Sequence, residues 1–185
     1  MMQAESGIFV LRTDESVHIR VIGRGSFHNS RPLRSFASAA IERGSRQFVL
    51  DLEQCAGMDS TFLGVLTGVG LSLRQQNPPG TVHVIKTTPH SRELLKSLWL
   101  NRLFSVKANG VDLAGFVPPA GTDLQKLPDS DLSDGTKPLP REATREVMLT
   151  AHDDLIRADS RNAAKFAEVT KLLREEAQLP RVAES

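Results

Sequence analysis

The sequence predicts an α/β domain with a mixed, mainly parallel sheet, followed by a proline-rich segment and a helical extension. Strand-like and helical hydrophobic patterns alternate over residues 8–107, prolines gather after residue 117, and helix-forming residues return from residue 141. Strands that alternate with helices pair in parallel through helical crossovers. The 185 residues suffice for one ordinary domain and an appendage. We therefore expect a domain over 1–116, a linker or strap over 117–140 and helices over 141–185.

Four to five strands are expected. Residues 8–11 and 16–22 are apolar or alternating runs separated by a Thr-Asp-Glu turn, which predicts an antiparallel hairpin. Residues 48–50 form a short, wholly apolar run that ends at Asp51, typical of a central strand covered on one or both faces. Residues 82–85 and 105–107 predict the remaining strands.

Three helices are expected between these strands. The first has apolar residues at helical spacing and is closed by Gly44; they are Leu33, Phe36, Ala37, Ala40 and Ile41. The second runs from Ser60 to about Asn77 and contains Gly64, Gly68 and Gly70. Each glycine costs up to about 1 kcal/mol relative to alanine, so we expect a close approach to the sheet or to a neighbour there. Thr88 and Pro89 start the third helix, giving the order β-β-α-β-α-β-α-β over residues 8–107.

The C-terminal third differs in composition. Half of the ten prolines lie between residues 117 and 140, which predicts a linker or a loosely held strap. Residues 141–178 then predict one long helix, or two helices broken near 159–160, with a thin apolar stripe of Leu155, Phe166, Val169, Leu172 and Leu173. A narrow stripe needs a partner surface, because most helical stability comes from packing. We expect it to pack on the sheet, with homodimerisation through the C-terminal helix as the alternative.

Composition narrows the classes of partner. The formal net charge of +1 provides no long-range attraction for nucleic acid or an anionic membrane, so neither is expected as a partner. Cys55 is the only cysteine and cannot form an internal disulfide, and no apolar run approaches the roughly 20 residues that cross a bilayer. The first residues lack the basic and apolar stretches of a signal peptide. A cytoplasmic protein is the simplest expectation.

No catalytic motif stands out. Cys55 lacks the local context of a catalytic cysteine, and a small buried residue is the favoured interpretation. The histidines show no His-x-x-x-His spacing, and no Walker loop or Gly-x-Ser-x-Gly motif occurs. We expect no metal, no cofactor and no catalytic residue, and keep a small enzyme with an unrecognised site as the weakest alternative.

The most informative stretch spans residues 48–66, Phe-Val-Leu-Asp-Leu-Glu-Gln-Cys-Ala-Gly-Met-Asp-Ser-Thr-Phe-Leu-Gly-Val-Leu. A buried strand ending in Asp-Leu, a short loop, Met-Asp-Ser-Thr and a helix with Leu-Gly follow one another. This order resembles the central pattern of the STAS family, of the anti-sigma-factor antagonist type. Residues 89–95 and 100–104 also resemble the family's third helix and the exit to its last strand. The resemblance covers roughly residues 8–107.

The resemblance implies a phospho-regulated signalling module rather than an enzyme. The unmodified protein would bind an anti-sigma-type serine kinase, phosphorylation of Ser60 would release it, and a Ser/Thr phosphatase would reset it. Such partner switching regulates transcription. Thr61, one position later, is the second choice of acceptor. A scaffold or adaptor that is never phosphorylated is the main alternative.

Elementary electrostatics agrees with this assignment. A helix start carries unpaired N–H groups and the positive end of the helix dipole, so a phosphate of about −1.5 to −2 charges is tolerated there. Asp59 or Ser60 is expected to cap the helix, although Asp-Ser-Thr taken alone is also an ordinary capping sequence.

Two features depart from the family pattern and complete the expected partner-binding set. Phe62 stands where many members have a small residue; we favour its packing inward over a docking role. The segment Gly23–Asn29, which the resemblance places beside the switch serine, carries Arg24 and His28 where members often have an acidic residue. The expected partner-binding residues are Asp59, Ser60, Thr61, Phe62, Arg24 and His28.

Overall fold

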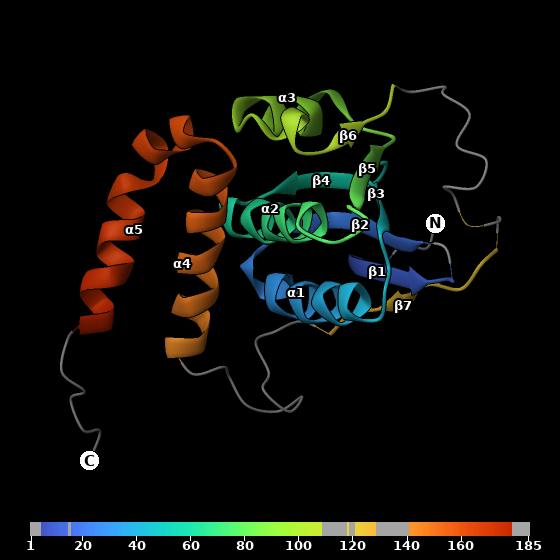
Figure 1. The fold of residues 1–185 in the computed structure, drawn as a ribbon, viewed down its shortest axis with the longest axis horizontal. Helices are drawn as coiled ribbons and strands as arrows, with labels where there is room; N and C mark the ends of the chain where they lie inside the picture. The colour runs from blue at the N-terminus through green and yellow to red at the C-terminus, as the bar shows by residue number, and fades with distance from the viewer. Residues whose placement is uncertain (1–4, 15, 109–117, 119–120, 129–140, 179–185) are drawn as a thin grey trace, which may run out of the picture.

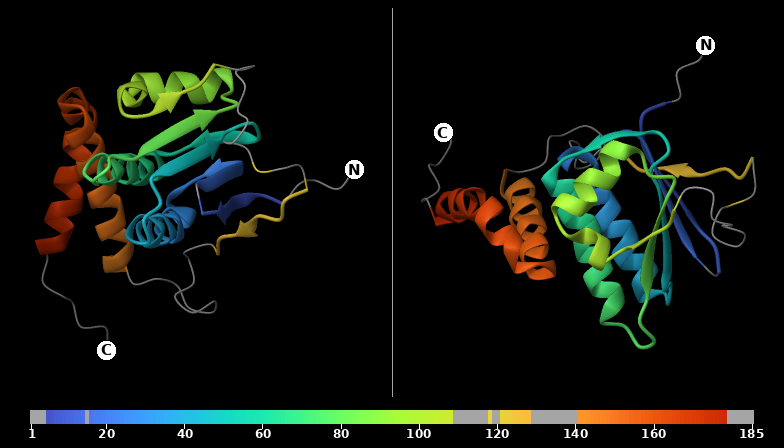
Figure 2. Two further views of the ribbon diagram at one scale, coloured as in Figure 1. Left: turned by 45° about the vertical axis from the view of Figure 1, so that its right-hand side comes forward. Right: turned by 90° about the horizontal axis from the view of Figure 1, so that it is seen from above.

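A computed structural model describes residues 5–14, 16–108, 118, 121–128 and 141–178. The described chain forms three layers: a sheet, a layer of helices α1 to α3 on one face of it, and an outer pair of helices, α4 and α5 (Figure 1). Viewed along the layers, the outer pair lies on the side of the inner helices that is away from the sheet (Figure 2).

The sheet has seven strands, in the order β6-β5-β3-β2-β1-β7 with β4 paired to β2. β1 is antiparallel to β2 and to β7, whereas β3, β4, β5 and β6 pair in parallel. Their bounds are β1 (Gly7–Arg12), β2 (Val17–Gly25), β3 (Gln47–Asp51), β4 (Cys55–Met58), β5 (Thr81–Ile85), β6 (Ser105–Val106) and β7 (Gln125–Lys126). The predicted class, a mixed and mainly parallel sheet with helices and a C-terminal helical extension, is confirmed.

The helices follow the predicted order. Their bounds are α1 (Phe27–Glu42), α2 (Ser60–Arg74), α3 (Pro89–Ser97), the 3-10 turn η1 (Leu100–Arg102), α4 (Arg141–Ala158), the 3-10 turn η2 (Ser160–Asn162) and α5 (Ala163–Gln178). The predicted break near residues 159–160 is confirmed by η2. Thr88 caps α3 by accepting a hydrogen bond from the N–H of Ser91, with Pro89 at the first helical position, as predicted.

Three boundaries differ from expectation. α1 begins at Phe27, six residues before the expected apolar stripe, and contains Pro32 within its first turns. β4 was not predicted, because Cys-Ala-Gly-Met has no strand-like alternation. It pairs only with the last three residues of β2. β7 lies inside the segment expected to be a linker or strap, and pairs with β1 through Phe9 and Val10. Of that segment, residues 117, 119–120 and 129–140 lie outside the described residues.

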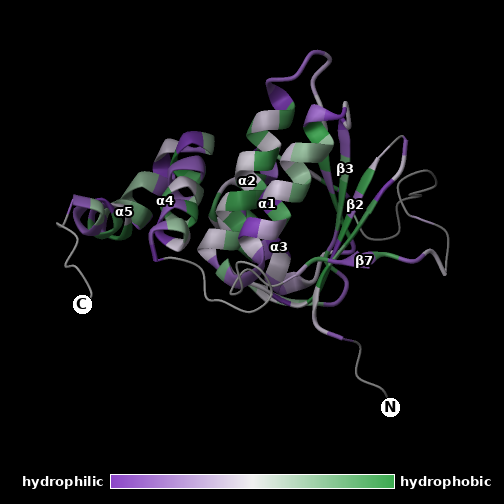
Figure 3. Ribbon diagram, turned by 90° about the horizontal axis from the view of Figure 1, so that it is seen from below, coloured by the Kyte–Doolittle hydropathy of each residue, from purple (hydrophilic) through white to green (hydrophobic). Residues whose placement is uncertain are grey.

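One hydrophobic core lies between the sheet and the inner helices. Strand residues such as Ile19 and Leu50 and helix residues such as Leu33 and Leu66 are at most 2% exposed. Apolar residues predominate in α2 and the central strands, whereas apolar and polar residues alternate along α4 and α5 (Figure 3). Leu127, just after β7, is buried in the same core, so the strap contributes to the domain.

The glycines of α2 lie at close contacts, as expected. A Cβ on Gly70 would lie 2.9 Å from the Phe104 ring, and one on Gly64 would lie 2.2 Å from the carbonyl oxygen of Ala151 in α4. Glycine is therefore required where α2 meets the segment before β6 on one side and α4 on the other.

The expected place of the C-terminal helices was wrong in one respect. α4 packs mainly on α2, and also on α1, rather than on the sheet. The reason is that the inner helices already cover that face of the sheet. Leu155 is fully buried and joins the core, Phe166 is partly buried, and Leu172 remains 53% exposed. Leu155 and Leu173 of the stripe are thus buried within the same chain, whereas Leu172 is not.

Candidate functional site

Asp59 organises the start of α2. Its backbone is extended, with φ −85° and ψ 171°, and its Oδ1 accepts a hydrogen bond of 2.9 Å from the N–H of Phe62. Its other oxygen, Oδ2, accepts a hydrogen bond of 2.9 Å from the N–H of Phe27, the first residue of α1. Asp59 rather than Ser60 is therefore the N-cap, and one carboxylate joins the first turns of two helices.

Ser60 is the first residue of α2 and is half-buried. Its Oγ lies 2.9 Å from Nε2 of His152 in α4. The other ring nitrogen, Nδ1, lies 2.7 Å from the carbonyl oxygen of Met148 and must carry a proton, because a carbonyl oxygen only accepts. In the neutral imidazole, Nε2 then carries no proton and accepts a hydrogen bond from the Ser60 hydroxyl group.

His152 was not among the predicted site residues. It is 2% exposed, and its ring lies 5.0 Å from the ring of Phe166 in α5, measured between centroids. The two partners of the Ser60–His152 hydrogen bond are 92 residues apart in the chain. The sequence signal for His152 is weak: a polar residue stands one turn before Leu155, at a position where the apolar stripe would continue.

Thr61 and Phe62 face the interior. Thr61 is 3% exposed and Phe62 is fully buried, with its ring against Gly25 at the end of β2. Their side chains are not accessible to a partner in this arrangement. The inward packing of Phe62 is the alternative that the sequence favoured, and its ring packs the start of α2 against the end of β2.

Arg24 and His28 lie close to the start of α2. They belong to the end of β2 and the start of α1, not to a free loop, and β2 pairs with β4 through Gly25 and Met58. The N–H of Asp59 donates to the carbonyl oxygen of Gly25 at 3.0 Å. Arg24 is exposed, and the half-buried His28 ring stacks at 3.7 Å on Phe27. Of the predicted partner-binding side chains, Arg24 is exposed and Asp59, Ser60 and His28 are partly accessible.

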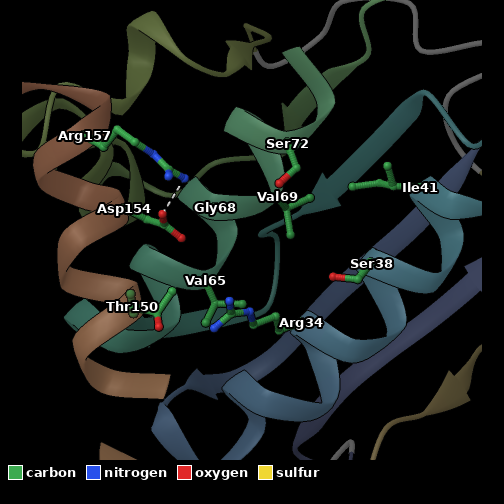
Figure 4. Close-up of a pocket in the computed structure, with 11 residues that line it drawn as sticks. Arg34, Ser38, Ile41, Val65, Gly68, Val69, Ser72, Thr150, Asp154 and Arg157 are labelled. Atoms are coloured by element: carbon green, nitrogen blue, oxygen red, sulfur yellow. Dashed lines mark hydrogen bonds and ion pairs between the residues drawn. The ribbon is translucent and has the colours of Figure 1, made fainter. Parts of the chain in front are cut away.

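A polar cavity of about 200 Å³ lies between α1, α2 and α4. Asp154 of α4 projects into it beside Gly68 and forms an ion pair of 2.7 Å with Arg157, while Arg34 approaches from α1 (Figure 4). Burial raises the pKa of Asp154 above its ordinary value, although Arg157 and Arg34 oppose the shift. A Cβ on Gly68 would lie 2.3 Å from Oδ2 of Asp154, so this glycine provides the space for the carboxylate.

A second set of contacts holds the outer helices to α3. The Arg161 guanidinium lies 3.3 Å from the centre of the Trp99 ring, a cation–π contact. The side-chain amide of Asn162, which is fully buried, donates to the carbonyl oxygens of Leu98 at 3.1 Å and Leu155 at 3.0 Å. Lys165 donates to the carbonyl oxygen of Ser97.

Other candidate chemistry can be located. Cys55 is 5% exposed, and burial raises the pKa of its thiol. Over the described ranges, no three His, Cys, Asp or Glu side chains gather where they could hold a metal ion. Among the described helices, none combines the length and the hydropathy needed to span a bilayer.

No family model matches the chain. Among solved structures, the chain is similar to the unphosphorylated anti-sigma factor antagonist SpoIIAA, with 24% identity, a TM-score of 0.44, and coverage of 49% of this chain and 82% of that one. It is also similar to the phosphorylated SpoIIAA of Bacillus, with 22% identity, a TM-score of 0.47, and coverage of 55% and 92%. An anti-sigma factor antagonist from Mycobacterium paratuberculosis matches at 17% identity, a TM-score of 0.48, and coverage of 58% and 90%. The similarity in fold spans about half of the chain, which carries α4 and α5 in addition.

Proposed function

We propose that the chain is a phospho-regulated protein-binding module of the anti-sigma-factor antagonist type, with Ser60 as the acceptor. The unmodified form binds a partner serine kinase, phosphorylation releases it, and a Ser/Thr phosphatase resets it. The module itself catalyses nothing. The observation that carries the proposal is the position of Ser60, half-buried at the first residue of α2, whereas the adjacent Thr61 is buried.

The charge around Ser60 favours an effect on a partner over an effect on folding. Asp59 already accepts a hydrogen bond from one N–H group at the start of α1 and from one at the start of α2. A phosphate would therefore not replace a missing cap. It would instead add about −1.5 to −2 charges next to an existing carboxylate. A partner that binds the surface around the neutral Ser60 hydroxyl would then meet a strongly negative surface. The exposed Arg24 lies nearby on β2.

One observation favours a second candidate, a permanent scaffold or adaptor. The Ser60 hydroxyl already bonds to His152 and so serves the packing of α4. A small enzyme would instead need a pocket with several ionisable side chains near the ends of the parallel strands. The cavity that holds Asp154, Arg157 and Arg34 lies between helices instead.

Phosphopeptide mapping and intact-mass measurement of the protein from its native cell distinguish the first two candidates. As a functional test, Ser60→Ala and Ser60→Asp proteins serve as baits in the same cell extract. We expect Ser60→Ala to retain the kinase and Ser60→Asp to lose it at least about tenfold, as for removal of about 1.4 kcal/mol of binding free energy. Ser35→Asp, on an exposed part of α1, is the matched control. Undiminished capture of the kinase by Ser60→Asp contradicts the proposal.

A further inference from the structure

We propose that α4, η2 and α5 form a displaceable cover over the start of α2, and that docking of this cover and phosphorylation of Ser60 exclude one another. This inference rests on the proposed function for its claim that Ser60 is modified. It adds a step to that function: the face of α2 that begins at Ser60 is a docking surface for a helix, and its occupant in this structure is the chain's own α4.

α4 occupies the space that a phosphate on Ser60 would need. The Ser60 oxygen is 2.9 Å from His152, and the backbones of α2 and α4 touch one turn later, where a Cβ on Gly64 would lie 2.2 Å from the Ala151 carbonyl oxygen. One turn further, Asp154 fills the space beside Gly68. A phosphoryl group on Ser60 would need the volume that the buried His152 ring occupies. A change of side-chain conformation cannot make room for the phosphate, because the contact of α4 with α2 runs through backbone atoms at Gly64 and Ala151.

The second argument is electrostatic. A phosphate on Ser60 would stand beside the Asp59 carboxylate, and Asp154 enters the same α2–α4 contact two turns along. The Asp59 carboxylate repels it, whereas Asp154 is paired with Arg157. Attraction to a protonated His152 is the opposing effect, but the Met148 carbonyl and the Phe166 ring fix that imidazole on its other sides. A phosphate on Ser60 needs more room than the 2.9 Å that separates Oγ from Nε2 of His152, so pairing between the two also requires α4 to move away from α2.

The third argument concerns how firmly the cover is held. Its apolar anchors are Ala151 and Leu155 in α4 and Leu173 in α5, which are buried, with Val147, Ala158 and Phe166 partly buried beside them, while Leu172 is exposed. Several of its polar anchors lie at the surface, including the Arg161–Trp99 contact and the Lys165 bond to Ser97. Exposed ionic contacts contribute little each, about 0–1 kcal/mol. A modification of Ser60 therefore removes a hydrogen bond to the buried His152 that these surface contacts do not replace.

The test places phosphoserine directly at position 60 of the full chain by genetic encoding, so that it needs no kinase. Amide hydrogen exchange then reports α4 and α5, and the fluorescence of Trp99, the only tryptophan, reports the Arg161 contact. We expect the amides of α4 and α5 to lose protection at least about tenfold, because a buried hydrogen bond is lost and its partner stranded. Trp99 emission should change in parallel. The strands β3 and β5 should keep their protection.

Phosphoserine at position 93, on an exposed part of α3, is the control for added charge on a helix surface and should leave the cover docked. His152→Ala should loosen the cover without any phosphate, whereas His152→Gln, which can still accept from Ser60, should loosen it less. If phosphoserine at position 60 unfolds the sheet as well, Ser60→Asp is examined with the same two readouts. Unchanged protection of α4 in the folded modified chain overturns the inference.

Failure of this inference and failure of the proposed function are separable. A native protein that never carries phosphate on Ser60 refutes the proposed function, whatever the installed phosphoserine does to α4. An installed phosphoserine that leaves the cover docked refutes mutual exclusion, even if the native protein is found phosphorylated on Ser60.

Discussion

At the scale of single residues, Asp59 has the largest structural role in the site. It is one of the predicted partner-binding residues, and its two carboxylate oxygens accept from the N–H groups of Phe62 and Phe27. It therefore determines how α1 and α2 start relative to one another. Any binding role of Asp59 depends on this structural one.

Replacing Asp59 separates its two hydrogen bonds. We expect Asp59→Ala to lower the free energy of unfolding by about 2 kcal/mol, because α2 loses its cap and the N–H of Phe27 at the start of α1 loses its acceptor. Asp59→Asn keeps one acceptor oxygen and should lose about half of that. Urea denaturation of both variants measures the difference. Equal stabilities for Asp59→Ala and the native protein would show that the N–H groups find other partners.

Asp154 gives a pH-dependent prediction. Burial raises its pKa in the folded protein, so the folded state binds the proton more tightly than the unfolded state does. Its contribution to stability is therefore present below the unfolded pKa of about 3.9 and is lost as pH rises through the folded value. Asp154→Asn should raise the melting temperature at pH 7 by up to about 3 °C and have no effect near pH 3.

The matched control for Asp154→Asn is Glu146→Gln, which removes an exposed carboxylate from the same helix. It should leave the melting temperature unchanged at both pH values. A lower melting temperature for Asp154→Asn at pH 7 would mean that the ion pair with Arg157 outweighs burial.

At the scale of elements, α2 shows what the sequence could predict and what it could not. Its start, its family pattern and the close approach at its glycines were predictable, because capping, apolar spacing and glycine content are local signals. The identity of the neighbour was not. The contact between Ser60 and His152 joins segments 92 residues apart, and no local pattern specifies such a pairing.

The strands follow the same rule. The hairpin and the buried strands were predictable from alternation and apolar runs, whereas β4 and β7 are short and pair with only three and two residues of their neighbours. β7 has two residues, Gln125 and Lys126, and neither is apolar. Their place in the sheet depends on the strand beside them, β1, and on the buried Leu127 that follows.

The docking of α5 on α4 can be tested through its apolar residues. Phe166 packs beside His152, and Leu173 is 8% exposed. Replacing both with Asp should destabilise the chain by several kcal/mol, of order 2–5 for two buried side chains, without changing its mass in solution. Light scattering and thermal melts measure both quantities. A dimer that becomes a stable monomer would instead favour the homodimer alternative.

At the scale of the whole molecule, the inner helices separate the sheet from the outer pair. The core cluster lies mainly between the sheet and α1 to α3, and α4 adds Ala151 and Leu155 to its edge. The outer pair therefore extends a core that is largely complete without it. The inner layers should form a folding unit.

A chain ending at residue 128, which retains β7 and Leu127, should fold cooperatively without the outer helices. Its melting temperature should fall by about 5–15 °C, because the uncovered face of α2 loses the packing of Leu155 and Ala151. Calorimetry and binding of an apolar dye measure these effects. A chain ending near residue 120 is the comparison, and it should be less stable since it lacks β7. An aggregated or non-cooperative 128-residue chain would place the outer helices within the folding unit.

The edge strand β7 also affects how tightly a partner must bind α2 in order to displace α4. Because β7 is paired to β1, only residues 127–140 separate the last residue of β7 from the first residue of α4. Covalent geometry limits their span to roughly 50 Å, whatever their conformation. A helix on so short a connection is present at an effective concentration of order millimolar. A partner at micromolar concentration must therefore bind α2 about a thousandfold more tightly than α4 does, unless a modification first weakens the intramolecular contact.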